Sequence, residues 1–201
     1  MFGPDMIFAI PGLLLAMTVH EYAHARVAVA MGDFTPRMTG RLTLNPVAHI
    51  DPIGLLMLFF AQFGWAKPVM INARNFKDWR KGELYVSLAG PAANLVTAFI
   101  AMLLLAAVGE QARWIYNVLY LIVLYNINFA VFNMIPLPPL DGSKVLMSFL
   151  PGEWAYKLAG IERYSFLILI VLVFTNVLGM IIFPIRAVLL NMMSNIVSLI
   201  F

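Results

Sequence analysis

Long runs of apolar residues constrain this chain more than any other feature of its sequence. A helix needs roughly 20 mostly apolar residues to cross a bilayer, and five segments reach or approach that length. They are Met6 to Met31, Leu84 to Val108, Trp114 to Ile135, Tyr164 to Phe183, and Ile185 to Phe201, with Pro184 dividing the last two. At 62% apolar and 11% charged residues, the composition is too apolar for a soluble domain. We therefore expect an all-α polytopic membrane protein with about five transmembrane helices that contact the lipid bilayer.

Shorter elements are expected between the first two spans. The apolar run from Ile53 to Trp65 is too short to cross a bilayer and predicts a re-entrant or interfacial segment. The stretches Met38 to Leu44 and Ala66 to Asn72 show partial alternation and contain β-branched residues. They predict two or three short strands in a small membrane-associated β-sheet.

The basic residues predict the orientation of the chain. Seven of the thirteen Lys and Arg residues lie between Gly32 and Glu83, and the positive-inside rule places that loop in the cytoplasm. Counting the spans then puts the turn at Gly109 to Arg113 outside and the segment from Asp141 to Arg163 inside. The basic residues are scattered among apolar runs and form no stripe or tail, so no nucleic-acid partner is expected. The N-terminal apolar run lacks a basic flank and exceeds signal-peptide length, so it is expected to be a structural segment.

The first span contains three ionisable residues in five positions, His20-Glu21-Tyr22-Ala23-His24. Placing ionisable side chains inside a membrane is energetically unfavourable. Histidines four apart share one helical face and can bind one divalent cation, while the glutamate can deprotonate a water. Composition alone would produce this pattern with a probability on the order of one in a thousand. The alternative is a pair of buried histidines whose hydrogen bonds are satisfied by backbone or water.

A zinc site with two histidines needs a third protein ligand, and the chain has no cysteine to supply it. Asp141 is the acidic residue nearest the cytoplasmic end of a span. It follows the third full span after three prolines that must end regular helix, Pro136, Pro138 and Pro139. Backbone of this kind at membrane depth must be buried in protein or line a wet cavity. The alternative for Asp141 is a solvated turn aspartate before Gly142.

Two motifs together resemble the site-2 protease family of zinc intramembrane metalloproteases. They are H-E-x-x-H at positions 20–24 and N-x-x-P-x-P-P-L-D-G at positions 133–142. Positions 90–94 also look like the family's G-x-x-x-(N/S/G) motif, and positions 44–54 are similar to a segment of its small prokaryotic branch. The resemblance is to the small prokaryotic type, and the chain is expected to differ from many relatives in having no PDZ or CBS domain and no span before the H-E-x-x-H helix.

The resemblance also implies a role for each motif residue. His20, His24 and Asp141 would ligate one Zn²⁺ per chain, Glu21 would be the general base toward a zinc-activated water, and Asn133 would hold the substrate or stabilise the oxyanion. Gly90 and Asn94 would contact substrate. The chain would form one membrane-embedded metalloprotease domain over 1–201, with a zinc-binding core at about 6–142 and C-terminal helices at about 164–201.

The implied activity is regulated intramembrane proteolysis. The protein would be an endopeptidase that hydrolyses peptide bonds in the transmembrane segments of single-span membrane proteins. It would be a multi-pass protein of a prokaryotic cell membrane, with its active site towards the cytoplasm.

Several polar residues also have plain structural explanations. Asn133 equally fits a role in satisfying backbone groups freed by Pro136, and the spacing of Gly90 and Asn94 suits close helix packing. Asn126 shares a helical face with Asn133 and is expected to turn inward. His49 is a candidate for a second metal-site group, a plug residue, or a loop histidine bonded to its neighbours.

Two other classes of function compete with a protease. Inward-facing His and Asp residues also line ion pathways, so a metal transporter or metal-binding membrane protein is the main alternative. A pathway needs polar residues through the whole membrane depth, yet the first span is apolar from Ile7 to Met17. An inactive relative that acts as a scaffold is the third possibility, and the intact Glu21 argues against it.

Overall fold

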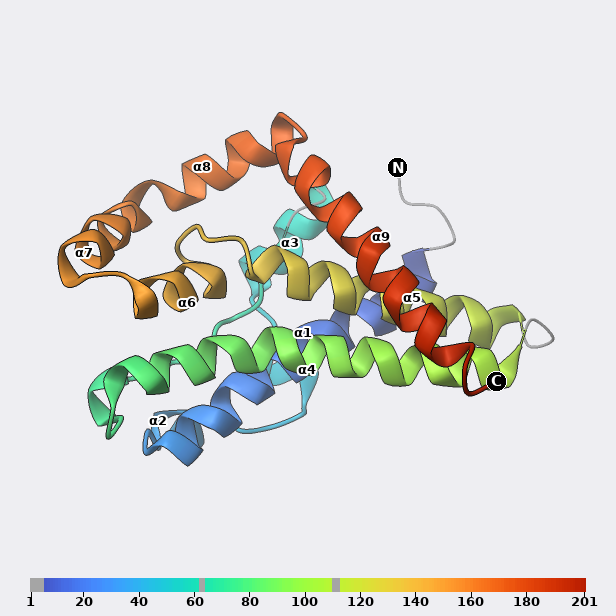
Figure 1. The fold of residues 1–201 in the computed structure, drawn as a ribbon, viewed down its shortest axis with the longest axis horizontal. Coiled ribbons are helices and arrows are strands. Elements are labelled where there is room, and N and C mark those ends of the chain that lie inside the picture. The colour runs from blue at the N-terminus through green and yellow to red at the C-terminus, as the bar shows by residue number, and fades with distance from the viewer. Residues whose placement is uncertain (1–5, 62–63, 110–112) are drawn as a thin grey trace.

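A computed structural model describes residues 6–61, 64–109 and 113–201, and the described chain is helical, as expected (Figure 1). The longer helices are α1 (Met6–Met31), α3 (Pro52–Ala61), α4 (Trp79–Val108), α5 (Arg113–Asn133), α8 (Glu162–Phe174) and α9 (Val177–Val197). The shorter ones are α2 (Thr35–Met38), α6 (Asp141–Phe149), α7 (Gly152–Gly160), and the 3₁₀ turns η1 (Pro46–His49) and η2 (Ala73–Asn75).

Helices α1, α4 and α5 pack against one another and form the centre of the molecule (Figure 1). Ala16, Ala25 and Ala28 of α1 have no exposed surface, and such small side chains let helices approach closely. Helix α9 crosses α4 and α5, where Ala98, Ile127 and other apolar residues form a buried cluster. Helices α6, α7 and α8 form an arc that returns the chain from α5 to α9 (Figure 1).

Three of the described helices are long and apolar enough to cross a membrane. They are α4, α5 and α9, whose most apolar windows have mean hydropathies of 2.1, 1.7 and 1.8. Helix α1 matches the bounds expected for the first span, but it is not one of these three helices. Helix α3 has only 10 residues, which agrees with the expectation that its apolar run cannot span a bilayer.

The predicted β-sheet is wrong. No strand forms within residues 6–61, 64–109 and 113–201, and the nearest feature is one isolated antiparallel bridge between Ile50 and Ala66. Pro68 cannot donate a ladder hydrogen bond. The backbone N–H groups of Val69 and Asn72 donate to carboxylates of other segments, at 2.9 and 2.7 Å, so they are not available to a neighbouring strand.

Asp33 is one of those carboxylates, and it fixes the segment 66–75 to the end of α1. It is fully buried and accepts hydrogen bonds from the backbone of Asn72 (2.7 Å), the side chain of Asn75 (2.8 Å), and the backbone and hydroxyl of Thr35. Burial would raise the pKa of Asp33, but these donors outweigh it and hold the pKa below its usual value.

The predicted helix break at Pro184 is also wrong, because Pro184 lies inside α9. The break between α8 and α9 is at Thr175 and Asn176 instead. Asn176 has a φ of 57°, the left-handed conformation that asparagine adopts more readily than most residues. A proline inside a helix leaves one backbone carbonyl without its helical donor but need not end the helix. Here α9 continues past Pro184, which lies on an exposed face.

Candidate metal centre

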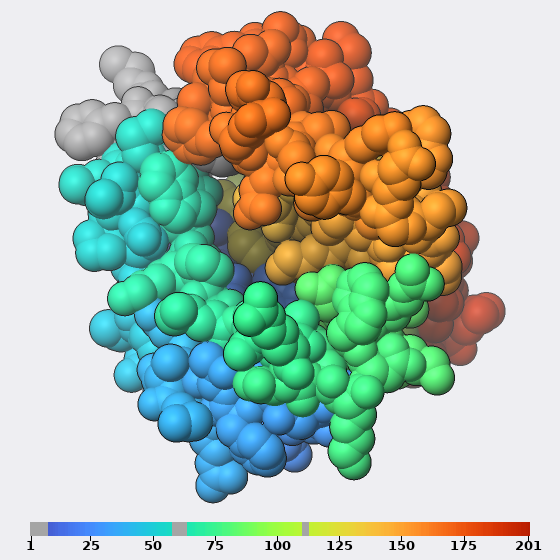
Figure 2. Space-filling view, turned by 90° about the vertical axis from the view of Figure 1, so that its left-hand side faces the viewer, coloured from blue at the N-terminus to red at the C-terminus, as the bar shows by residue number. Residues whose placement is uncertain are grey.

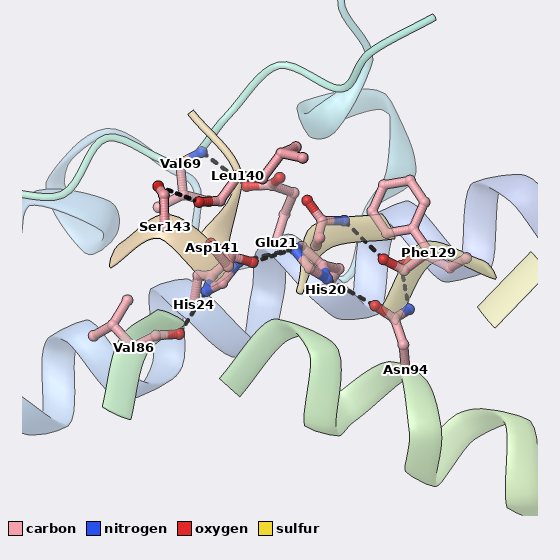
Figure 3. A network of polar contacts seen from close by, with 12 residues as sticks. His20, Glu21, His24, Val69, Val86, Asn94, Phe129, Leu140, Asp141 and Ser143 are labelled. Atoms are coloured by element: carbon pink, nitrogen blue, oxygen red, sulfur yellow. Dashed lines mark hydrogen bonds and ion pairs between the residues drawn. The ribbon is translucent and has the colours of Figure 1, made fainter. Parts of the chain in front are cut away.

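Two segments far apart in the sequence meet at one cluster of ligand atoms (Figure 3). His20 and His24 lie one turn apart on α1, and Asp141 is the first residue of α6. The two Nε2 atoms are 2.9 Å apart, and each is 3.1 Å from Oδ2 of Asp141. All three side chains are buried. The structure therefore brings together the three residues that the motifs single out.

The proline-rich segment after α5 places Asp141 in this cluster. Helix α5 ends at Asn133, as the prolines predict, and α6 packs against α4. Two tight turns connect α5 to α6. They contain hydrogen bonds from Leu137 N–H to the Ile135 carbonyl (2.8 Å) and from Leu140 N–H to the Leu137 carbonyl (2.9 Å). Gly142 permits this path, since a Cβ there would lie 2.2 Å from the carbonyl oxygen of Met134.

The hydrogen bonds of the histidines fix which ring nitrogen faces the cluster (Figure 3). Nδ1 of His20 is 2.7 Å from Oδ1 of Asn94, and Nδ1 of His24 is 2.7 Å from the carbonyl oxygen of Val86. Both oxygens can only accept, so the proton of each neutral ring is on Nδ1. The two Nε2 lone pairs therefore point at each other and at a carboxylate oxygen.

This arrangement fits a bound metal ion. Oδ2 of Asp141 is buried and has no hydrogen-bond donor, and three lone-pair atoms in contact repel one another without a cation. Ligands of a tetrahedral zinc at roughly 2.0–2.2 Å from the ion lie about 3.3 Å apart, close to the observed 2.9–3.1 Å. Two imidazole nitrogens and one carboxylate oxygen are a donor set that zinc prefers. Within the described part of the chain, this is the only such cluster of three side chains.

Glu21 lies beside the cluster, on the same turn of α1. One of its oxygens, Oε2, accepts a hydrogen bond from the backbone N–H of Val69 at 2.9 Å (Figure 3). The side chain is buried and lines the same cavity as His20, His24 and Asp141. A carboxylate held in this way has its second oxygen available to take a proton from water at the site.

A cavity of about 590 Å³ connects the cluster to the outside. Its wall is mostly apolar and comes from α1, α3, α4, α5, α6, α8 and the segment 64–71. Lys144 and Glu162 are charged residues in that wall. Figure 2 shows the hollow between the orange α8 and the green start of α4, at the end of the molecule where α2, α6 and α7 also lie. The cavity is therefore large enough and apolar enough for a peptide segment.

Of the other expected site residues, Asn133 lines the cavity, whereas Asn94 and His49 do not. The side-chain amide of Asn133 donates to the carbonyl of Phe129 at 2.9 Å. Asn94 has no exposed surface and contacts His20 instead of the cavity. His49 is buried and is not part of the ligand cluster. Its Nε2 donates to the carbonyl of Thr43 at 2.9 Å, which agrees with a loop histidine bonded to a neighbouring residue, and its Nδ1 has no partner.

Sequence reasoning did not assign three supports of the site, the backbone of Val69, the backbone of Val86, and the side chain of Asn126. The backbone partners Val69 and Val86 have no side-chain signature, so no pattern of residue types reveals them. Asn126 lies behind Asn94, and its amide oxygen accepts a hydrogen bond from Asn94 at 2.9 Å. The only signal for Asn126 was its expected place on an inward face of α5.

Gly90 gives the histidines the space they occupy. A Cβ at this position would lie 2.6 Å from Cε1 of His20 and 2.6 Å from Nε2 of His24. Gly90→Ala should therefore displace both rings and weaken zinc binding by at least about tenfold, although alanine is the better helix former. Zinc affinity, measured by competition with a chelator, checks this. Gly160→Ala in α7 is the matched control, because a Cβ there meets nothing within 4 Å, and equal zinc affinities in the two variants would contradict the prediction.

Comparisons with known proteins point to a zinc metalloprotease. The family model described as peptidase family M50 matches residues 105–178. The chain is 36% identical over 187 residues to "Putative zinc metalloprotease YwhC" of Bacillus subtilis, covering 89% of this chain and 85% of that protein. It is 33% identical over 179 residues to "Putative zinc metalloprotease Rip2" of Mycolicibacterium smegmatis, covering 86% and 69%. No solved structure matches the chain.

Proposed function

Because the chain belongs to peptidase family M50 and is a membrane zinc metalloprotease of the site-2 protease type, we propose that it hydrolyses peptide bonds inside membrane-spanning segments of other proteins. The observation that supports this most is the position of the His20, His24 and Asp141 cluster. The cluster lines a largely apolar cavity, where a membrane-embedded peptide can be accommodated.

We assign a residue to each step of hydrolysis. When bound to His20, His24 and Asp141, zinc supplies a Lewis acid that lowers the pKa of water and polarises a carbonyl. Glu21 takes a proton from the attacking water, whose oxygen adds to the carbonyl carbon of the scissile bond. The C–N bond then breaks, and Glu21 returns the proton to the departing amine. Asn133, in the wall of the same cavity, donates a hydrogen bond to the substrate carbonyl as negative charge develops on its oxygen.

The cavity wall favours an apolar, extended substrate. A helical substrate hides its carbonyls in its own hydrogen bonds, so its chain must unwind before it reaches Glu21. We assign single-span membrane proteins as substrates. Gly90 and Asn94, which are buried behind the histidines, hold the metal ligands in this proposal and do not contact substrate.

The experiment uses purified full-length protein in liposomes that contain a model membrane-spanning peptide. A chelator should abolish cleavage, and one equivalent of Zn²⁺ per chain should restore it, with product masses that place the cut inside the span. The same liposomes report on the competing function, a zinc transporter. Uptake of zinc into the liposomes without peptide products would overturn the proposed protease function.

We also propose that α1 lies in the bilayer with α4 and α5, between which it packs, and that the cavity opens to the cytoplasmic side of a prokaryotic cell membrane. The basic residues support this orientation. Arg37 in α2, Arg80 and Lys81 in α4, and Lys157 in α7 lie in helices at the end of the molecule where the cavity opens.

Cysteine labelling tests this orientation in a chain that has no cysteine of its own. Lys77, Arg113 and Glu153 are exposed positions before α4, at the start of α5 and in α7. In intact cells, an impermeant thiol reagent should label Arg113→Cys and should leave Lys77→Cys and Glu153→Cys unlabelled until the cells are opened. Labelling of the latter two from outside would invert the topology.

A further inference from the structure

Polar side chains on three different helices form one line of hydrogen bonds behind the metal centre. Nδ2 of Asn126 on α5 donates to the carbonyl of Ile122 at 2.9 Å. Oδ1 of Asn126 accepts from Nδ2 of Asn94 on α4 at 2.9 Å. Oδ1 of Asn94 in turn accepts from Nδ1 of His20 on α1 at 2.7 Å (Figure 3). Both asparagine side chains are completely buried, so water does not compete for these bonds.

Each bond in this line has a fixed direction. A carbonyl can only accept, so the amide nitrogen of Asn126 faces Ile122 and its oxygen faces Asn94. The amide nitrogen of Asn94 then lies between two acceptors, the Asn126 oxygen and the carbonyl of Ala16 at 2.8 Å. A flipped Asn94 amide would place its oxygen against both acceptors and leave them without a donor. The oxygen of Asn94 therefore faces His20.

The direction of the line determines the state of the His20 ring. A neutral imidazole has one proton, and the Asn94 oxygen requires it on Nδ1. Nε2 of His20 is then left with its lone pair towards His24 and Asp141. For His24, the backbone carbonyl of Val86 holds the ring proton on Nδ1 in the same way. The tautomer of His20 is thus held by side chains, those of Asn94 and Asn126, whereas that of His24 is held by the backbone.

We propose that Asn126 is a positioning residue for the zinc site: it sets the amide orientation of Asn94 and so keeps Nε2 of His20 available to the metal. The inference rests on the zinc site of the proposed function. Asn126 lies outside the H-E-x-x-H, G-x-x-x-N and proline-rich motifs, so none of them assigns it a role. Outer partners that fix the tautomer and orientation of a ligating histidine typically change metal affinity by about 10- to 100-fold when removed.

The test measures zinc affinity of the zinc-loaded, full-length protein by competition with a chelator. Asn126→Leu, which is similar in size, removes both hydrogen bonds and should weaken zinc binding by about 10- to 100-fold. Asn126→Asp presents an oxygen to Asn94, and the protonated carboxyl that burial favours can donate to the Ile122 carbonyl, so this variant should retain most of the affinity. Asn128→Leu is the matched control on the same helix, because its Oδ1 has no partner. Asn126→Ala takes the place of the leucine variant if that variant does not fold.

A double-mutant cycle separates positioning from a general structural role. If Asn126 acts through Asn94, Asn126→Leu should cause no further loss of zinc affinity in an Asn94→Leu background. An undiminished second loss there would overturn the proposal. So would an Asn126→Leu protein that binds zinc as tightly as Asn128→Leu, or an Asn126→Asp protein that loses as much affinity as Asn126→Leu. A protein that binds zinc but cleaves no peptide would overturn the proposed function and leave this inference standing.

Discussion

Replacing Glu21 with glutamine is expected to lower peptide cleavage by about 10²- to 10⁴-fold, the range over which a general base acts, while zinc content is unchanged. An amide oxygen can still accept the hydrogen bond from Val69 N–H, so the geometry of the turn is preserved. The amide has no basic oxygen to take the proton from water. His20, His24 and Asp141 are untouched, so the metal stays. Cleavage of a membrane-spanning peptide and zinc per chain, measured on one preparation, check both halves of this prediction.

Glu162→Gln is the matched control for Glu21→Gln. Glu162 also lines the cavity, but it does so from α8 and is not part of the cluster on α1. Glu162→Gln removes one negative charge from the same cavity, as Glu21→Gln does, but it should leave most of the activity in place. Normal turnover by Glu21→Gln would show that another group is the base.

Asp141→Ala should have the second large effect, because it removes the third ligand. The two histidines that remain bind zinc weakly, and affinity should fall by at least about 100-fold, more than the loss of an outer partner causes. Activity should fall with it. Dialysis of the purified variant against a mild chelator, followed by metal analysis, measures the effect.

Glu153→Gln in α7 provides the control for Asp141→Ala, since Glu153 pairs with Lys157 on an exposed surface. This variant should keep one zinc per chain. Stoichiometric zinc retained by Asp141→Ala after the same dialysis would place the third ligand elsewhere in the chain.

Much of the site could be predicted because its parts are local in sequence. His20, Glu21 and His24 share one turn of one helix, so their spacing alone puts them side by side. Asp141 could be added because the prolines before it end α5 and oblige the chain to turn at membrane depth. The helical architecture followed from the lengths of the apolar runs.

The errors and omissions came from contacts between distant segments. The segment 66–72 resembles a strand in its residue pattern, but Glu21 and Asp33 accept its backbone hydrogen bonds, and both lie more than 30 residues earlier in the chain. The contact between Asn94 and His20 depends on how α4 packs against α1. The break at Asn176 is an error of another kind, because it depends on a local left-handed backbone conformation that other asparagines in the chain could also have adopted.

X-ray absorption at the zinc edge of the purified full-length protein tests the central claim most directly. Two histidines and one carboxylate around a single zinc predict scattering from two imidazole rings and from oxygen, with no sulfur, in a chain that has no cysteine. Glu21→Gln should give the same spectrum, and Asp141→Ala should not. A wild-type spectrum with fewer than two imidazoles, or one that Asp141→Ala leaves unchanged, would contradict the assignment of His20, His24 and Asp141 as the zinc ligands.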